Sequence, residues 1–297
     1  MRRTCRFLLS LWAAAPLLAG ADLAVRDDTG QEIRLKAPAR RIVTLAPHAA
    51  ESLFAAGAGD RLVGTVNFSD YPEAARKVPQ VGGYDRFDLE AVVALKPDLV
   101  IGWQSGNAPA QLDKLKALGV PVFVLQPNRL EDVAGQLEQM GRLAGTEAVA
   151  NAAAARFRER LAGLRKAYGG KPPVRVFYQV WKTPLMTVGR PQIISDLIHL
   201  CSGDNVFGKL DQMAPTVSVE AVLAADPEVI VASGMGDDRP EWLDDWRQWK
   251  NVTAVKRQNL FHISPYILQR HTPRLLDGAE RLCAVLEEAR TRRPKAL

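Results

Sequence analysis

The feature that most constrains this sequence is a strand–helix alternation that runs twice, once on each side of a long helical stretch. The first run predicts strands at 41–46, 61–66, 98–102 and 120–124, with helices at 49–58, 89–95 and 108–118. The second run predicts strands at 174–179, 229–232 and 260–263, with helices at 193–201, 219–225, 242–249 and 273–290. An alternation of this kind indicates parallel sheets that helices cover on both faces.

An internal repeat relates the two runs. Residues 88–101 align with residues 218–231 at an offset of 130 positions, and a glutamate, a proline and the apolar strand that follows coincide in both copies. The repeat predicts two similar α/β lobes. In such folds a ligand binds in the crevice near the carboxyl ends of the strands, so we expect it between the lobes.

The first residues predict a cleaved secretory signal peptide. Three arginines precede a short apolar run, and an Ala-Gly-Ala cleavage site follows at 19–21. No later run approaches the roughly 18 apolar residues that a membrane span requires, so we expect a soluble exported protein. Cleavage lowers the formal net charge from +6 to +3. A nucleic-acid partner is therefore not expected, because its binding would need a strongly basic surface.

The stretch between the two runs reads as helices over 130–168, broken around 141–146. A helix from Glu147 to Tyr168 would be about 33 Å long, enough to bridge two lobes, although an ordinary packed helix is the alternative. We expect an α/β protein with two Rossmann-like lobes, each with a central, mostly parallel sheet, joined by a single long helix. The expected divisions are a signal peptide at 1–21, an N-terminal lobe at 22–128, a helical connector at 129–172 and a C-terminal lobe at 173–297.

Cleavage also removes Cys5 and leaves Cys201 and Cys283. Two cysteines in an oxidising compartment are more often joined than free, although two separate buried thiols remain the alternative. The bond would close a loop of 82 residues, which is worth about 4 to 5 kcal/mol by chain entropy. The four histidines, at 48, 199, 262 and 271, are scattered and predict no metal site.

The sequence contains no recognisable catalytic constellation. A nucleophile elbow, a zinc-protease helix, a Walker loop and a Cys-x-x-Cys motif are all absent. Trp242, Trp246 and Trp249 have the spacing of one buried helical face, so we interpret them as core.

Aromatic residues do gather at predicted strand ends and in loops of both halves: Phe68, Tyr71, Tyr84, Trp103, Trp181 and Tyr266. Each alone is more often a packing residue. Together, at equivalent strand ends, they favour a cleft for a large, flat, partly apolar ligand.

Four stretches carry a resemblance to a known family: RIVTLAPHAAESLFAAG at 41–57, FSDYP at 68–72, VVALKPDLVIGWQSGN at 92–107 and LCSGDNVF at 200–207. The chain resembles the periplasmic substrate-binding proteins of the helical-backbone class, and their cobalamin-binding branch most closely. The class serves ABC importers of cobalamin, haem and iron–siderophores. The resemblance implies a monomeric periplasmic receptor, not an enzyme and without a cofactor, that passes cobalamin or a related corrinoid to an inner-membrane permease dimer with its ATPase subunits.

Two other functions stay open. The first is binding of haem or an iron–siderophore, against which weigh the cobalamin-type loops and the lack of an arginine cluster for siderophore carboxylates. The second is an exported α/β enzyme, against which weighs the missing nucleophile–base pair. The class's stiff connector further implies that the lobes move little when a ligand binds.

The resemblance assigns roles by position. It implies ligand-binding residues at Phe68, Tyr84, Trp103 and Arg270, and the places of His48, Trp181 and Tyr266 in loops and at strand ends add these three as candidate ligand-binding residues. It implies that Glu90 and Glu220 dock on arginines of the permease, although a helix N-terminus also favours a glutamate. It further implies a disulfide between Cys201 and Cys283.

Several positions depart from the family pattern, so the pocket is rebuilt. A pocket tryptophan expected near Ala214 is absent, Val180 replaces a phenylalanine and Tyr266 occupies an aspartate position. His48 replaces a small residue in the first strand–helix loop. As a hypothesis it could coordinate cobalt in a corrinoid or iron in haem, and the alternative is a hydrogen-bonded histidine at a helix start.

Overall fold

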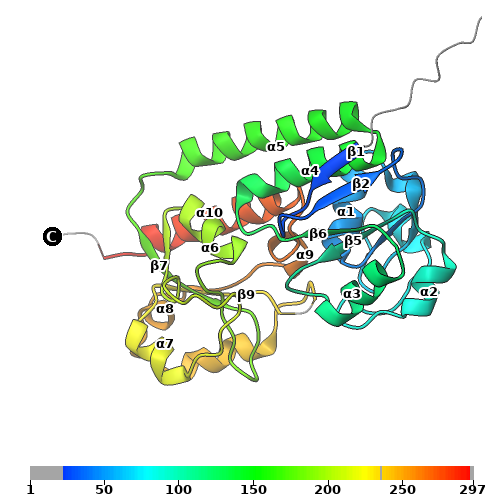
Figure 1. Cartoon of the computed structure of the whole chain (residues 1–297). Coiled ribbons are helices and arrows are strands. Elements are labelled where there is room, and N and C mark those ends of the chain that lie inside the picture. Colours follow the sequence, from blue (N-terminus) through cyan, green and yellow to red (C-terminus); the bar gives the residue numbers. More distant parts are fainter. Residues whose placement is uncertain (1–22, 235, 295–297) are drawn as a thin grey trace, which may run out of the picture.

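Two four-stranded parallel sheets, one in each half of the chain, organise the fold. A computed structural model describes residues 23–234 and 236–294, so the predicted signal peptide lies outside the described residues. The first sheet has the strand order β4-β3-β5-β6 and the second β10-β9-β7-β8, and all pairings in both are parallel. The prediction of two α/β lobes with parallel sheets is confirmed (Figure 1).

The elements follow the predicted ranges closely. The first half contains the hairpin strands β1 (Leu23–Arg26) and β2 (Glu32–Leu35), the sheet strands β3 (Ile42–Thr44), β4 (Leu62–Gly64), β5 (Leu99–Trp103) and β6 (Val122–Leu125), the helices α1 (Pro47–Ala55), α2 (Leu89–Ala94) and α3 (Pro109–Ala117), and the 3₁₀ helices η1 (Gly59–Arg61) and η2 (Glu73–Lys77). The second half contains the strands β7 (Val174–Gln179), β8 (Gly203–Asn205), β9 (Val229–Ala232) and β10 (Leu260–His262), the helices α6 (Ile193–Leu200), α7 (Val219–Ala225), α8 (Thr253–Lys256), α9 (Pro265–Leu268) and α10 (Leu275–Thr291), and the 3₁₀ helix η3 (Glu241–Gln248). No helix in these described ranges is long and apolar enough to cross a membrane.

Two helices follow the first sheet in the chain, α4 (Leu130–Ala144) and the longer α5 (Glu147–Tyr168). They pack against each other, and at their closest approach a Cβ on Gly141 would lie 2.3 Å from the Cβ of Ala150. In Figure 1, α5 runs along the top of both lobes. At 22 residues it is about 33 Å long. The long bridging helix is confirmed, and it is also a packed helix, because Phe157 and its apolar neighbours are buried.

One hydrophobic core runs through both lobes and the connector. Successive strand residues point to opposite faces of a sheet, so Leu99 and Ile101 of β5 join this shared core while Val100 joins a separate one. In β9, Val229 and Val231 join the shared core in the same way, and Ile230 joins a third. The shared core therefore holds the sheet faces that α1 and α10 cover, and α4 and α5 pack against those two helices.

The prediction of an α-helix around residues 242–249 with three tryptophans on one buried face was wrong. The segment forms the 3₁₀ helix η3, and Trp242, Trp246 and Trp249 do not share a buried face. Trp246 is 4% exposed, whereas Trp249 is 38% exposed. A 3₁₀ helix has three residues per turn, so Leu243 and Trp246 lie above one another and both are buried. The i, i+4, i+7 spacing belongs to an α-helix and was the wrong period here.

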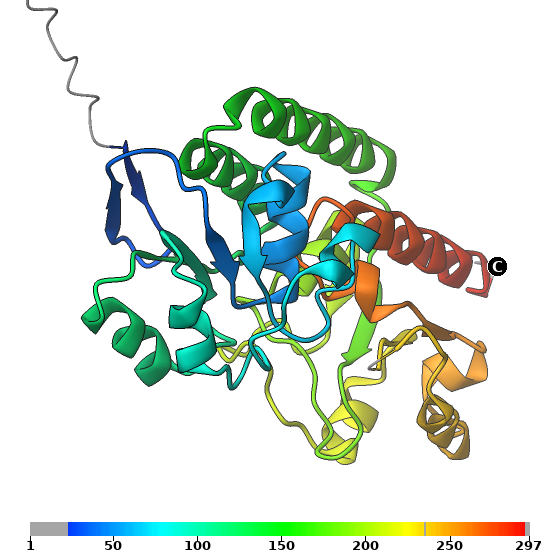
Figure 2. The same ribbon diagram turned by 90° about the vertical axis from the view of Figure 1, so that its right-hand side faces the viewer.

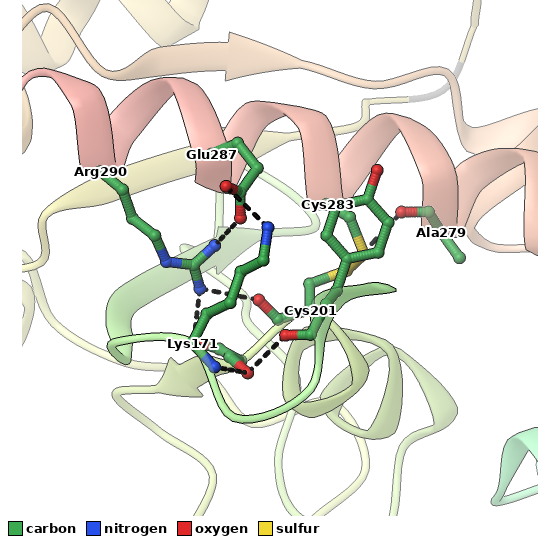
Figure 3. The surroundings of a disulfide bond; sticks show 8 residues. Lys171, Cys201, Ala279, Cys283, Glu287 and Arg290 are labelled. Atoms are coloured by element: carbon green, nitrogen blue, oxygen red, sulfur yellow. Dashed lines mark hydrogen bonds and ion pairs between the residues drawn. A yellow bond between two sulfur atoms is a disulfide. The ribbon is translucent and has the colours of Figure 1, made fainter. Parts of the chain in front are cut away.

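The expected disulfide joins Cys201, at the end of α6, to Cys283 in the middle of α10. Figure 3 shows the polar contacts that surround it. Arg290 of α10 donates to the carbonyl oxygen of Cys201 at 2.8 Å and also contacts Glu287, which pairs with Lys171 at 2.9 Å. Beside these contacts, α10 packs against α5 and α6 (Figure 2).

Candidate functional site

Trp103, the last residue of β5, is the centre of an aromatic group at the carboxyl end of the first sheet. The centroid of its ring lies 5.0 Å from the ring centroid of His48, in an edge arrangement, and 5.8 Å from that of Tyr84. Tyr84 is 38% exposed and Trp103 is half-buried. These three predicted site residues are therefore in contact, and Tyr84 presents an open aromatic surface.

Asn107 fixes this group through three hydrogen bonds, although sequence reasoning did not assign it a role. Its side-chain oxygen accepts from the backbone N–H of Trp103 at 2.6 Å, and its amide nitrogen donates to the carbonyl oxygens of Tyr84 and Leu45. Gly106 leaves the space that the indole needs, because a Cβ there would lie 1.8 Å from the ring of Trp103. Both residues belong to the W-x-x-G-N pattern, which was the available signal.

Phe68 lies in a separate loop beyond β4 and is the most exposed of the predicted site residues, at 56%. Its backbone has a φ of +66°, a conformation that turns the loop sharply. The next residue anchors the loop: Ser69 is buried and accepts a hydrogen bond from Thr65, which bonds Thr44 of β3. A surface pocket opens beside Phe68 and Asp70.

Arg270 connects the Phe68 loop to the second lobe. It donates to the side chain of Asp70 at 2.6 Å and to the carbonyl oxygen of Phe68 at 2.9 Å. Its guanidinium also lies 4.7 Å from the ring centroid of Tyr266, a cation–π contact. The structure therefore groups Phe68, Tyr266 and Arg270, with Arg270 buried and engaged in contacts between the lobes.

Beside Arg270, Glu51 of α1 is the acceptor of a second set of contacts between the lobes. Arg274 donates two hydrogen bonds to its carboxylate, at 2.7 and 2.8 Å, and Thr272 donates a third at 2.6 Å. Glu51 is 2% exposed, so the ion pair is buried on its acidic side. Arg274 also stacks on the ring of Tyr71. We call the contacts of segment 270–274 with the first lobe the seam.

Two buried histidines face each other at the seam. His48 comes from α1 and His271 from the segment after α9, and their ring centroids lie 5.3 Å apart. Burial lowers the pKa of His271 to about 4. The pKa of His48 also lies well below its usual value, first because of burial and then because of His271 and Arg270. Both rings are therefore neutral at pH 7.

Trp181 follows β7 and is 38% exposed. Among the described residues, none of the ring contacts or hydrogen bonds joins it to another predicted site residue. The same part of the chain holds no group of three or more His, Cys, Asp or Glu side chains that could bind a metal ion.

Glu90 and Glu220 occupy equivalent places in the two lobes. Each is the second residue of a short helix, α2 or α7, and each helix begins with a capping side chain, Asp88 or Ser218, that accepts backbone hydrogen bonds. Both glutamates are exposed. Hydrogen bonds from its own backbone and from Ser218 lower the pKa of Glu220, so it is charged at neutral pH.

Comparison with known proteins places this architecture in a family. Residues 42–267 match the sequence profile of the family described as periplasmic binding protein. The chain belongs to the periplasmic binding protein family. Its relatives include the vitamin B12-binding protein of Vibrio parahaemolyticus, which is 36% identical over 86% of this chain and 92% of its own.

Solved structures of periplasmic binding proteins share the fold. The vitamin B12 binding protein BtuF of Vibrio cholerae is 36% identical, with a TM-score of 0.79 over 85% of this chain and 98% of its own. The heme-binding protein RhuT of Roseiflexus is 23% identical, with a TM-score of 0.75 over 84% of this chain and 98% of its own. The likeness to RhuT is one of fold alone.

Four residues that the sequence analysis did not assign to the site support the predicted site residues of this periplasmic binding protein. His271 contacts His48 and Trp103, Asn107 bonds Trp103 and Tyr84, and Glu51 pairs with Arg270 and Arg274. Glu51, His271 and Arg274 were missed because their partners lie far away in the sequence, and a single sequence does not show such pairs. The one local signal for His271 and Arg274 was their position next to Arg270.

Proposed function

We propose that this periplasmic binding protein captures cobalamin or a related corrinoid after export to the periplasm and delivers it to an ABC importer. The observation that carries the proposal is the 36% identity, over nearly all of both chains, to proteins named for binding vitamin B12. The predicted signal peptide supports the location. A transport role, without catalysis, fits the lack of a nucleophile–base motif in the sequence.

Capture rests on aromatic surface in this proposal. Phe68, Tyr84 and Trp181 each expose more than a third of their area, and Trp103 supports Tyr84 from behind by ring contact. Flat apolar rings of this kind bury large areas against a macrocycle. Tyr266 and Arg270 contribute polar groups, and Arg270 also positions the Phe68 loop through its carbonyl oxygen.

The test is co-elution of ligand absorbance after the purified protein is incubated with cyanocobalamin, haemin or ferric siderophores. We expect cyanocobalamin to co-elute. We expect Trp103→Ala to weaken cyanocobalamin binding at least about tenfold. Truncation of a buried aromatic side chain costs about 3–5 kcal/mol of stability, and part of that cost falls on ligand binding when the side chain supports the binding site. Trp249→Ala is the matched control, because Trp249 directly follows η3 and is exposed. Equal effects of the two variants, or no bound cyanocobalamin, would contradict the proposal.

Haem is the second candidate, favoured by one observation. The Nε2 atom of His48 is buried without a hydrogen-bond partner, and histidine is a common axial ligand of haem iron. The same atom is the proposed axial ligand of cobalt in a corrinoid. An unchanged ligand spectrum and affinity in His48→Ala would exclude coordination in either case. Co-elution of haemin in place of cyanocobalamin would select the second candidate.

Delivery is proposed to use Glu90 and Glu220, which would dock on basic residues of the permease dimer and its ATPase complex. Their equivalent, exposed positions at the starts of α2 and α7 support this role. We expect Glu90→Arg with Glu220→Arg to abolish uptake in cells while ligand affinity of the purified protein stays unchanged. Loss of ligand affinity, or uptake at the normal rate, would argue against docking.

The lobe divisions and the oligomeric state belong to the same proposal. We place the N-terminal lobe at 22–128, the connector at 129–172 and the C-terminal lobe at 173–297, with the segment 270–274 returning to contact the first lobe. One copy of the chain holds all the proposed ligand-binding residues, so we propose a monomer.

A further inference from the structure

Four buried ring nitrogens without a hydrogen-bond partner lie together at the seam. Three belong to the histidines, Nε2 of His48 and both Nδ1 and Nε2 of His271, and the fourth is Nε1 of Trp103, whose ring contacts both histidines. The two histidines are 4% and 3% exposed, and they come from opposite sides of the seam. A buried polar group without a partner costs about 1–3 kcal/mol, so native proteins rarely keep several together without a use.

The protonation state suits metal binding. A metal ion binds the lone pair of a neutral imidazole, and a histidine with an ordinary pKa must first lose its proton in mildly acidic solution. Burial lowers the pKa of His271 to about 4, and it lowers that of His48 in the same direction. Both side chains therefore offer lone pairs over the whole neutral and mildly acidic range.

The distance between the ring centroids distinguishes two ways in which the two rings could hold a metal ion. With a metal–nitrogen bond of about 2.1 Å, each ring centroid lies about 3.2 Å from the ion, so two rings at a tetrahedral angle are about 5.2 Å apart. Two rings on opposite faces of a macrocycle metal would be about 6.4 Å apart. The observed 5.3 Å fits a shared free cation.

The neighbours of the two rings are a paired guanidinium and an indole. Arg270 is the cation whose charge reaches His48, and Asp70 at 2.6 Å and Glu51 at 3.9 Å pair with it. The indole of Trp103 covers the pair, with ring centroids 5.0 Å from His48 and 6.3 Å from His271. The charged neighbour of the proposed ion would therefore be a guanidinium that two carboxylates already pair with.

We propose that His48 and His271 together bind one transition-metal cation of the Zn²⁺, Ni²⁺ or Cu²⁺ type across the seam, with water completing its coordination. Imidazole nitrogens suit these ions. The described residues place no group of three or more such ligands together, so the site is a two-histidine site with an exchangeable ion. Because each lobe supplies one ligand, a bound ion would tie the lobes together. The site shares His48 with the proposed ligand site but does not rest on the transport function proposed above.

The experiment uses the exported protein, purified without a histidine tag, treated with EDTA and then titrated with Co²⁺. We expect the visible absorption of tetrahedral Co²⁺ and its loss on addition of Zn²⁺. His48→Ala and His271→Ala should each weaken Co²⁺ binding at least about tenfold, since loss of even an outer-shell partner costs 10–100-fold. His199→Ala is the matched control, because His199 is exposed on α6, and it should leave the titration unchanged.

A wild-type protein that gives no Co²⁺ absorption overturns the proposal, whatever the folding of the variants. Absorption that persists in both histidine variants also overturns it. His271→Gln keeps a polar side chain of similar size and replaces His271→Ala if that variant does not fold. Cyanocobalamin binding measured in EDTA reports on the proposed transport function separately, so either proposal can fail without the other.

Discussion

At the residue scale, the polar contacts of the site converge on a few buried side chains. Glu51 accepts three hydrogen bonds from the segment 270–274, and Asn107 makes three with the backbone of Trp103, Tyr84 and Leu45. Each replaces water by several protein partners, so the loss of one side chain leaves several groups unsatisfied. These two residues therefore position the site without presenting surface of their own to a ligand.

Glu51→Ala should destabilise the protein by about 3 kcal/mol, because removal of one member of a buried ion pair leaves its partners uncompensated. The partners here are Arg274 and Thr272. The measurement is chemical denaturation at neutral pH. Glu138→Ala is the control: Glu138 pairs with Arg158 at the surface of α4, and such pairs are worth less than about 1 kcal/mol. Equal losses in the two variants would show that the seam adds nothing to stability.

His271 should make the stability depend on pH. Its pKa is about 4 when folded and 6.5 when exposed, so the unfolded chain binds more protons between these values. The contribution of His271 to the free energy of unfolding is fully present above pH 6.5. It is lost as the pH drops toward 4, by about 2–3 kcal/mol at pH 4.5. His48 shifts in the same direction.

Denaturation curves in EDTA at several pH values measure this dependence. His271→Gln should flatten it, whereas His199→Gln should leave it unchanged. The same slope in the wild type and in His271→Gln would contradict the assignment.

At the element scale, the segments with clear boundary signals were predictable, and several of the shortest ones were not. The ranges of α5, β7, α7 and β9 agree with the sequence-based ranges at both ends. Their boundaries carry strong local signals, such as Ser218 before α7 and the glycines after α5. The strand β8 and the helices α8 and α9 span at most four residues each, too few for periodicity to register. For η3 the sequence predicted a helix in the right place but with the period of an α-helix, whereas the segment is a 3₁₀ helix.

The disulfide links the end of α6 covalently to α10. Replacing Cys201 and Cys283 together by alanine should lower the free energy of unfolding by about 2–5 kcal/mol, because the unfolded chain regains the freedom of an 82-residue loop. Denaturant titration measures the change. A reducing agent should destabilise the wild type and leave the double variant unaffected. A variant as stable as the wild type would mean that packing of α6 against α10 suffices.

At the scale of the whole molecule, the two lobes are joined by a shared core as well as by the chain. Residues of β5, α5 and β9 belong to the same buried cluster, so a large rotation of one lobe would expose apolar surface. The two-lobe fold was predictable because it follows from a sequence repeat. The seam was not, because it joins residues 200 or more positions apart.

The shared core predicts a small change of shape on ligand binding. We expect the radius of gyration, about 19 Å for a chain of this size, to stay nearly the same when cyanocobalamin is added. Small-angle X-ray scattering with and without ligand measures it. A marked compaction would require the core between α5 and the lobes to open, and would contradict this expectation.

The seam also sets an order of events during biogenesis. A chain leaves the ribosome and the export channel from its amino terminus, so α1 is outside long before its partners at 270–274. Until they arrive, the carboxylate of Glu51 has neither Arg274 nor Thr272 to bond, and closure must span more than 200 residues. The seam therefore forms only after residue 274 has been made, and a chain terminated before residue 270 can complete its first sheet but never join the two lobes there.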